Sequence, residues 1–78
     1  MNTRHLVHMA NQIGTYFAAD PDHALARAGI AEHLARFWEK RMRQNLYAGL
    51  EQPETEDLAP LVREALLEHR ARILGKSA

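Results

Sequence analysis

The sequence predicts an all-α fold, a small bundle of three to four helices joined by short loops. Apolar residues recur every three or four positions in four separate segments, and this 3.6-residue period fits them better than any strand pattern. Prolines stand where two of these segments begin, and Gly75 follows the last one. The 78 residues have room for a single domain, 1–78, in which we expect residues 1–2 and 75–78 to fray.

The first helix is expected over residues 3–18, where one face is apolar and the opposite face is polar. Asn2 or Thr3 can act as its N-cap by accepting a hydrogen bond from the first turn. His5 and His8 stand three positions apart, a spacing that can bring two imidazoles to one metal ion. No third ligand at i+4 or i+7 completes a zinc set, so we expect two solvated histidines. The apolar stripe consists of Leu6, Met9, Ala10, Ile13 and Phe17.

The second helix is expected over residues 20–38, with Asp20 as its N-cap and Pro21 at the first helical position. Apolar residues cover more than half of its circumference, which is more than a four-helix core needs. Either the helix is central in a tiny bundle, or one stripe docks on another protein or on a second copy. The two apolar sectors consist of Ile30, Leu34, Phe37 and Trp38, and of Ala24, Ala28, Ala31 and Ala35.

The third helix is expected over residues 40–50 and the fourth over residues 60–74, stopping at Gly75. The polar run 52–57 between them contains Pro53 and is expected to be a loop. The fourth helix has a second apolar stripe, rotated away from its main one. The stripes are Met42, Leu46 and Leu50 on the third helix, then Leu61, Val62, Ala65, Leu66 and Ile73 on the fourth, with Leu67, Ala71 and Leu74 as its second stripe.

The segment Gly29–Arg43 places two bulky aromatic residues, Phe37 and Trp38, side by side at the end of a helix. Adjacent helical residues point about 100° apart, so one small core cannot easily enclose both rings. Three cations follow at once, although cations in the first turn of a helix oppose its macrodipole. They are either solvated and offset by nearby carboxylates or used on an anionic surface. The three are Lys40, Arg41 and Arg43.

Composition narrows the classes of function. Ten basic and ten acidic side chains cancel, which argues against a general nucleic-acid binder. The absence of cysteine excludes disulfides, thiolate zinc sites and thiolate nucleophiles, and the scattered glycines form no phosphate loop. No apolar run fits a signal peptide or a membrane span, so we expect a cytoplasmic chain without a membrane partner. We expect no catalytic, cofactor-binding or metal site on it.

Three blocks, in this order, resemble the delta subunit of soluble, molybdenum-dependent, NAD-reducing formate dehydrogenases: RHLVHMANQIGTYFAADPD, GIAEHLARFWEKRMR and LAPLVREAL. The resemblance covers nearly the whole chain, from Arg4 to about Leu67. The family often has Asp-Pro where this chain has Glu39 and Lys40, so the second and third helices are expected to bend less sharply or run together. A serine usually stands where this chain has Ala59, which weakens the N-cap of the last helix by about 1 kcal/mol.

The resemblance implies a non-catalytic accessory subunit of a complex that converts formate and NAD+ to CO2 and NADH. In such complexes the large alpha subunit holds bis-molybdopterin guanine dinucleotide and iron–sulfur clusters. The beta and gamma subunits hold FMN and further clusters, and they reduce NAD. The delta chain is expected to bind the large subunit, and through it the beta and gamma subunits, and to support complex stability or cofactor maturation.

Within this hypothesis Phe37 and Trp38 are the anchors and Arg41 and Arg43 are charged contacts at the rim, because buried aromatics and arginines often dominate interface energy. The alternative is a self-associating helical module without an enzyme partner, a homodimer built on the second and fourth helices. A helix-turn-helix nucleic-acid binder is disfavoured by the zero net charge. The interface residues we expect are Phe37, Trp38, Arg41, Met42, Arg43, Leu67 and Leu74.

Overall fold

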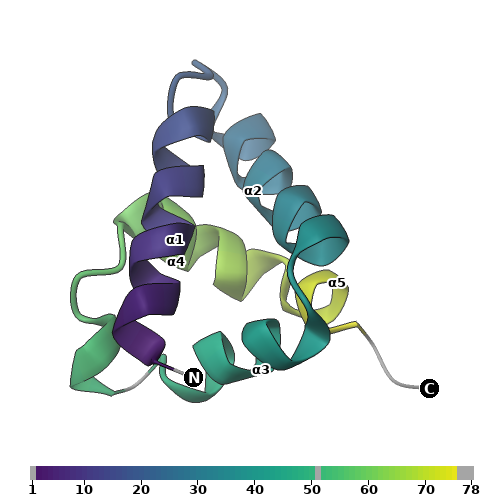
Figure 1. The fold of residues 1–78 in the computed structure, drawn as a ribbon. Coiled ribbons are helices and arrows are strands. Elements are labelled where there is room, and N and C mark those ends of the chain that lie inside the picture. Colours follow the sequence, from purple (N-terminus) through teal and green to yellow (C-terminus); the bar gives the residue numbers. More distant parts are fainter. Residues whose placement is uncertain (1, 51, 76–78) are drawn as a thin grey trace.

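Helices form nearly all of the regular structure in the computed structural model, which describes residues 2–50 and 52–75. The described residues contain no strand, so the predicted all-α bundle is confirmed. The helices α1 and α2 meet at the turn over residues 18–22 and diverge from there, and α3 lies across their open end (Figure 1). The elements are α1 (Thr3–Phe17), α2 (His23–Phe37), α3 (Lys40–Ala48), the 3₁₀ turn η1 (Pro53–Thr55), α4 (Pro60–Glu68) and α5 (Arg70–Leu74).

Both ends of the described chain are set by helix caps. The side chain of Asn2 accepts hydrogen bonds from the backbone N–H groups of Arg4, at 2.9 Å, and His5, at 3.4 Å, which confirms it as a cap of α1. Gly75 ends α5 with φ at 71°, a left-handed conformation that favours glycine. Of the residues predicted to fray, 1–2 and 75–78, residues 1 and 76–78 lie outside the described residues.

The predicted start of the second helix is wrong by two residues. The N-cap of α2 is Asp22, whose Oδ1 accepts from the N–H groups of Ala24, at 2.9 Å, and Leu25, at 3.2 Å. Asp20 accepts instead from the N–H of Asp22 at 2.9 Å, so it orders the turn ahead of the helix. Both aspartates around Pro21 are good caps, and the second one satisfies the free N–H groups of the first turn.

A sharp corner separates α2 from α3, although this chain has Glu39 and Lys40 where the family it resembles often has Asp-Pro. Trp38 has extended backbone angles, φ −88° and ψ 139°, and Glu39 continues extended before α3 begins at Lys40. The extended conformation at residue 38 turns the indole inward, where it is only 6% exposed. The expectation that the two helices run together is therefore wrong, because burial of the indole ends α2 without a proline.

The predicted third and fourth helices are both shorter in the structure. The third ends at Ala48, where Gly49 is the C-cap, rather than at Leu50. The fourth is divided at His69, whose backbone angles of φ −110° and ψ 32° are not helical. A straight helix over residues 60–74 would be about 22 Å long, at 1.5 Å per residue. The bend keeps its last turn, with Ile73, in the same core as α4.

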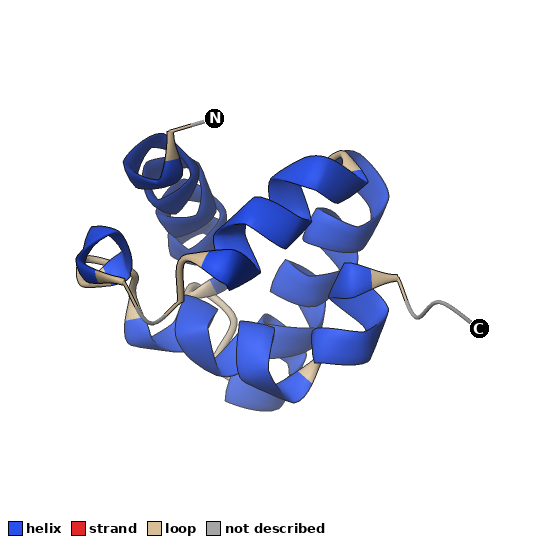
Figure 2. Cartoon of the chain, turned by 90° about the horizontal axis from the view of Figure 1, so that it is seen from below, coloured by secondary structure: helices blue, strands red, loops and turns tan. Residues whose placement is uncertain are grey.

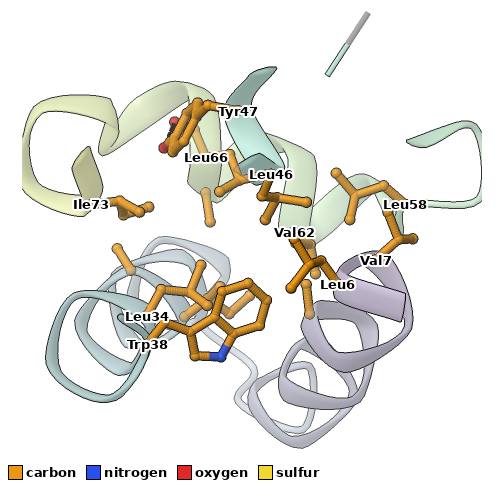
Figure 3. Packing of buried hydrophobic residues seen from close by; sticks show 14 residues of the cluster. Leu6, Val7, Leu34, Trp38, Leu46, Tyr47, Leu58, Val62, Leu66 and Ile73 are labelled. Atoms are coloured by element: carbon orange, nitrogen blue, oxygen red, sulfur yellow. Dashed lines mark hydrogen bonds between the residues drawn. The ribbon is translucent and has the colours of Figure 1, made fainter. Parts of the chain in front are cut away.

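One hydrophobic core joins all five helices and the loop before α4 (Figure 3). Leu34 and Trp38 approach it from α2, Leu6 from α1, and Leu66 and Ile73 from the chain's C-terminal part. Eight large side chains in the described residues are almost fully buried, and seven of these eight are apolar. The eight are Leu6, Ile30, Leu34, Leu46, Leu66, Ile73, Val62 and Thr55.

The loop between α3 and α4 lies beside α1 (Figure 2) and is fixed by two polar side chains. The buried hydroxyl of Thr55 lies within 3.0 Å of three backbone carbonyls of the same loop, including that of Gly49. From α1, the Nδ2 of Asn11 donates to the carbonyl of Asp57 at 2.9 Å, and its Oδ1 accepts from the N–H of Ala59 at 2.8 Å. The predicted loop is thus confirmed, and it is ordered by hydrogen bonds, most of which are buried or partly buried.

Close approach of α1 and α4 requires Gly14. A Cβ atom at this position would lie 2.5 Å from Cγ2 of Val62, a fully buried residue whose branched side chain has little rotamer freedom. We expect Gly14→Ala to lower the free energy of unfolding by about 1–3 kcal/mol, although alanine favours helices. Chemical denaturation followed by circular dichroism measures this. The cost should shrink in a Val62→Ala background, and an equal cost in both backgrounds would contradict the assignment.

A second prediction concerns Arg43, whose Nη1 donates to the carbonyl of Ile73 at 2.6 Å. This carbonyl belongs to the last turn of α5, which lacks helical partners and carries partial negative charge. We expect Arg43→Met, which keeps the apolar stem, to lower the free energy of unfolding by about 1–2 kcal/mol, because a charge-assisted bond is lost. The matched control is Arg41→Met at an exposed site, expected within about 0.5 kcal/mol. Equal effects would show that the hydrogen bond is unimportant.

Candidate partner-binding face

Four rings form a row across α1 and α2. Tyr16 and Phe17 meet edge to face with ring centroids 5.0 Å apart, Phe17 and His33 are 6.4 Å apart, and His33 and Phe37 are 4.8 Å apart. The outer rings are largely solvent-exposed, with 76% exposure at Tyr16 and 70% at Phe37. Large exposed aromatic side chains on one face are typical of an interaction surface.

Beside this row lies an open groove of about 600 Å³ between α1 and α2, which we call the aromatic groove. Its wall on α1 follows the helical period, so the apolar stripe predicted for that helix faces partly into the groove rather than wholly into the core. Seven side chains line it, and none of them carries a carboxylate. They are Met9, Gln12, Ile13, Tyr16, Phe17, His33 and Trp38.

The two adjacent aromatics at the end of α2 have opposite environments. Phe37 is exposed, whereas Trp38 belongs to the core and also lines the aromatic groove. The prediction that one small core takes only one of the two rings is therefore confirmed. The predicted interface anchor Trp38 is turned inward by its extended backbone, and the part of its side chain that solvent reaches borders the aromatic groove. Met42 is half-buried and packs against the same core.

The remaining predicted interface residues do not gather with Phe37. Arg41 is exposed, and Arg43 is engaged by the carbonyl of Ile73. Leu67 is 61% exposed on α4, among Arg27, Glu64 and Glu68. Leu74 is half-buried and lines a different groove between α3 and α5.

The groove between α3 and α5 has a volume of about 720 Å³ and was not predicted from the sequence. The guanidinium of Arg70 lies 5.0 Å from the ring centroid of Tyr47, and Lys40 and Leu74 line the same groove. The hydroxyl of Tyr47 donates to the carbonyl of Leu66 at 2.6 Å. Burial raises the pKa of Tyr47 to about 12, and the nearby Arg70 opposes the shift.

Ion pairs occupy the side of α2 that faces α4 and α5. Arg27 donates from Nε to Glu68 at 2.7 Å, and Arg72 pairs with Glu32. The hydrogen bond from Arg27 lowers the pKa of the Glu68 carboxyl below its ordinary value. In the described part of the chain, Lys40 and Arg41 have no such ion pair. The charged side of α2 is therefore internally paired, whereas these two cations in the first turn of α3 are not.

Sequence reasoning missed Tyr16 and Leu25, which are 76% and 59% exposed. A signal for Tyr16 was present: it precedes Phe17 at the end of a helix, just as Phe37 precedes Trp38. The same adjacency argument would have assigned one ring of the pair to the surface. Leu25 lies in the first turn of α2, and no sequence signal distinguishes it from the buried leucines.

No group of three or more His, Cys, Asp or Glu side chains within residues 2–50 and 52–75 is arranged to hold a metal ion. His5 and His8 are both exposed on α1. Among the same residues, no helix has the length and apolar character that crossing a membrane requires.

The fold and the aromatic face define a small all-α helical protein with an exposed aromatic surface of the kind that binds partners. The family of NADH-dependent formate dehydrogenase delta subunits, FdsD, matches residues 5–66. The chain belongs to this family, which confirms the resemblance seen in its three sequence blocks. Comparisons with curated proteins and with solved structures found no match.

The environment of Tyr47 predicts a stability change at high pH. Its pKa is about 12 in the folded chain and near its ordinary 10.0 when unfolded, so the folded state holds the proton more tightly. The stabilisation is complete below pH 10 and is lost as the pH rises toward about 12. Phenolate absorbance in a Tyr16→Phe variant, where Tyr47 is the only tyrosine, measures this, with the urea-unfolded chain as control. Half-ionisation near pH 10 in a chain still folded by circular dichroism would contradict the prediction.

Proposed function

We propose that this chain is a non-catalytic subunit that binds the large, molybdenum-containing subunit of an NAD-dependent formate dehydrogenase. Through the large subunit it joins the beta and gamma subunits. The oxidation of formate to CO2 and the reduction of NAD+ to NADH take place on those larger subunits. In this proposal they hold the bis-molybdopterin guanine dinucleotide, the iron–sulfur clusters and the FMN, and this chain holds none of these groups.

Membership of the delta-subunit family supports the proposal, and the observation that carries it is the exposure of Tyr16 and Phe37. The core already encloses Trp38 and apolar side chains from all five helices, so these two rings are surplus to folding. Leaving two large aromatic side chains in water forgoes the gain from burying them, about 1.5–3 kcal/mol for a side chain such as phenylalanine. A partner surface that covers both rings recovers that gain.

The alternative of a self-associating module is favoured by a separate observation. Leu25 on α2 and Leu67 on α4 are 59% and 61% exposed, and α2 and α4 are the helices on which that hypothesis builds a dimer. We expect this surface to bind a partner more weakly than the face of Tyr16 and Phe37, because Leu67 lies among the charged side chains of Arg27, Glu64 and Glu68. Charged residues are depleted at the centre of stable interfaces.

A capture experiment tests the proposal. The tagged chain is purified from its native host at mild salt, and the eluate is examined by mass spectrometry, metal analysis and formate-dependent NAD reduction. We expect the large subunit to be recovered with molybdenum and with activity, and the isolated chain to show none. Recovery of the chain alone, or only with copies of itself, would contradict the proposal and favour the self-associating module.

Deletion of the chain separates a role in complex stability from a role in cofactor maturation. If the chain stabilises the complex, the large subunit purified from the deletion strain contains molybdenum but is depleted of beta and gamma subunits. If the chain supports maturation, the other subunits remain together but the large subunit lacks the metal. Assembly and metal content equal to those of the wild type would contradict both roles.

A further inference from the structure

We propose that the aromatic groove binds a segment of the partner subunit that combines a bulky apolar side chain with a carboxylate. The apolar side chain fills the groove between α1 and α2. The carboxylate accepts a hydrogen bond from the indole N–H of Trp38. This inference rests on the proposed function, because it assigns the surface and the chemistry through which the chain joins its complex.

The indole of Trp38 carries a hydrogen-bond donor without an acceptor in the described part of the chain. The side chain is 6% exposed, and a tryptophan buried to this extent usually finds a partner for its N–H. Arg43 Nε is the enclosed side-chain nitrogen without a partner in the described residues, so the indole nitrogen is not sealed in. Figure 3 shows this nitrogen on the ring edge turned away from Leu46, in the space between α2 and α1. That space is the aromatic groove, which Trp38 lines.

The walls of the groove fit an apolar side chain of the partner. Met9, Ile13 and Phe17 are only partly buried where they border it, and each still presents apolar surface to solvent. Tyr16 belongs to the groove, and Phe37 ends the row of rings that runs along it. A side chain inserted here would be covered by apolar surface from both helices, the arrangement in which interface anchors contribute most.

Charge favours an anionic group beside that apolar side chain. None of the side chains that line the groove is a carboxylate, and the imidazole of His33 is among them. The guanidinium of Arg36, which also pairs with Glu32, lies 5.9 Å from the ring centroid of Phe37 at the end of the row of rings. A carboxylate that accepts from the indole N–H would meet no like charge among the side chains that line the groove, and its own charge would strengthen the hydrogen bond.

The test uses the purified delta chain and the formate dehydrogenase large subunit, with the beta and gamma subunits that remain attached to it, from a strain that lacks the delta chain. Variants compete with fluorescently labelled wild-type chain for this preparation, which we call the complex. We expect Tyr16→Ala and Phe37→Ala each to weaken binding by at least about tenfold, as truncated interface anchors do. Both side chains are exposed, so the variants should fold normally, which circular dichroism verifies. The matched controls Leu25→Ala and Leu67→Ala truncate similarly exposed side chains elsewhere and should bind within about twofold of the wild type.

Trp38→Phe tests the hydrogen bond by itself, because phenylalanine keeps an aromatic ring in the core and removes the N–H. We expect about tenfold weaker binding from the loss of a charge-assisted hydrogen bond. A separate readout uses the fact that Trp38 is the only tryptophan: 5-fluorotryptophan at this position gives a single fluorine resonance, which should shift when the unlabelled complex is added. An unmoved resonance, or wild-type affinity in a folded Trp38→Phe variant, would overturn the proposed hydrogen bond.

The outcomes separate this inference from the proposed function. If the wild-type chain binds the complex but Tyr16→Ala and Phe37→Ala bind equally well, the groove is not the docking site and the proposed function stands. Loss of binding only in Leu67→Ala would overturn the groove in favour of α4. If the wild-type chain does not bind the complex, or the two aromatic variants disrupt only self-association, both proposals fall.

Discussion

The arrangement of the helices depends on the burial of one indole, that of Trp38, at the corner between α2 and α3. To bring this ring into the core, residue 38 takes extended backbone angles, so α2 ends at Phe37. The preceding ring, that of Phe37, stays on the last turn of the helix and points outward, where it is 70% exposed. The same corner directs α3 across the open end of α1 and α2 (Figure 1). One buried side chain thus determines a helix end and the course of the next helix, directly beside the exposed ring of the candidate binding face.

The two sides of α2 are specialised for different tasks. Toward α4 and α5, Arg27 pairs with Glu68 and Arg72 pairs with Glu32, so charges on that side are matched within the chain. Toward α1, the side chains of the aromatic groove leave apolar surface and the indole N–H without partners in the described residues. Surface ion pairs contribute little stability individually, so their main effect here is to match charge on the side facing α4 and α5. The unmatched groups lie on the side of α2 that we propose faces the partner.

Much of the fold follows from local rules that a single sequence reveals. The period of apolar residues located the helices, and Asn2 and Gly75 marked the outer ends because capping depends on nearby backbone groups. Local rules did not separate Asp20 from Asp22, since both have the chemistry of a cap. They also missed the break at His69, which depends on how far the core extends. Arg43 shows the same limit, because its partner, the carbonyl of Ile73, is 30 residues away.

The sequence predicted that the candidate site contains an exposed aromatic ring, but it did not predict which residues form the site. Adjacent aromatics indicated that one ring of Phe37 and Trp38 stays outside, yet periodicity could not say which, because both lie in the same apolar sector. The choice is made by the backbone of residue 38, a tertiary effect. Leu67 and Leu74 were expected on one interface, but the bend at His69 directs them to different surroundings.

The most direct test of this account compares Trp38→Ala with Phe37→Ala in chemical denaturation of the isolated chain followed by circular dichroism. Truncating the buried indole should lower the free energy of unfolding by about 3–5 kcal/mol or prevent folding, since it opens a cavity in the core. Truncating the neighbouring exposed ring should change it by no more than about 0.5 kcal/mol. Equal effects, or a larger effect at Phe37, would show that the indole does not hold the corner and would contradict the account.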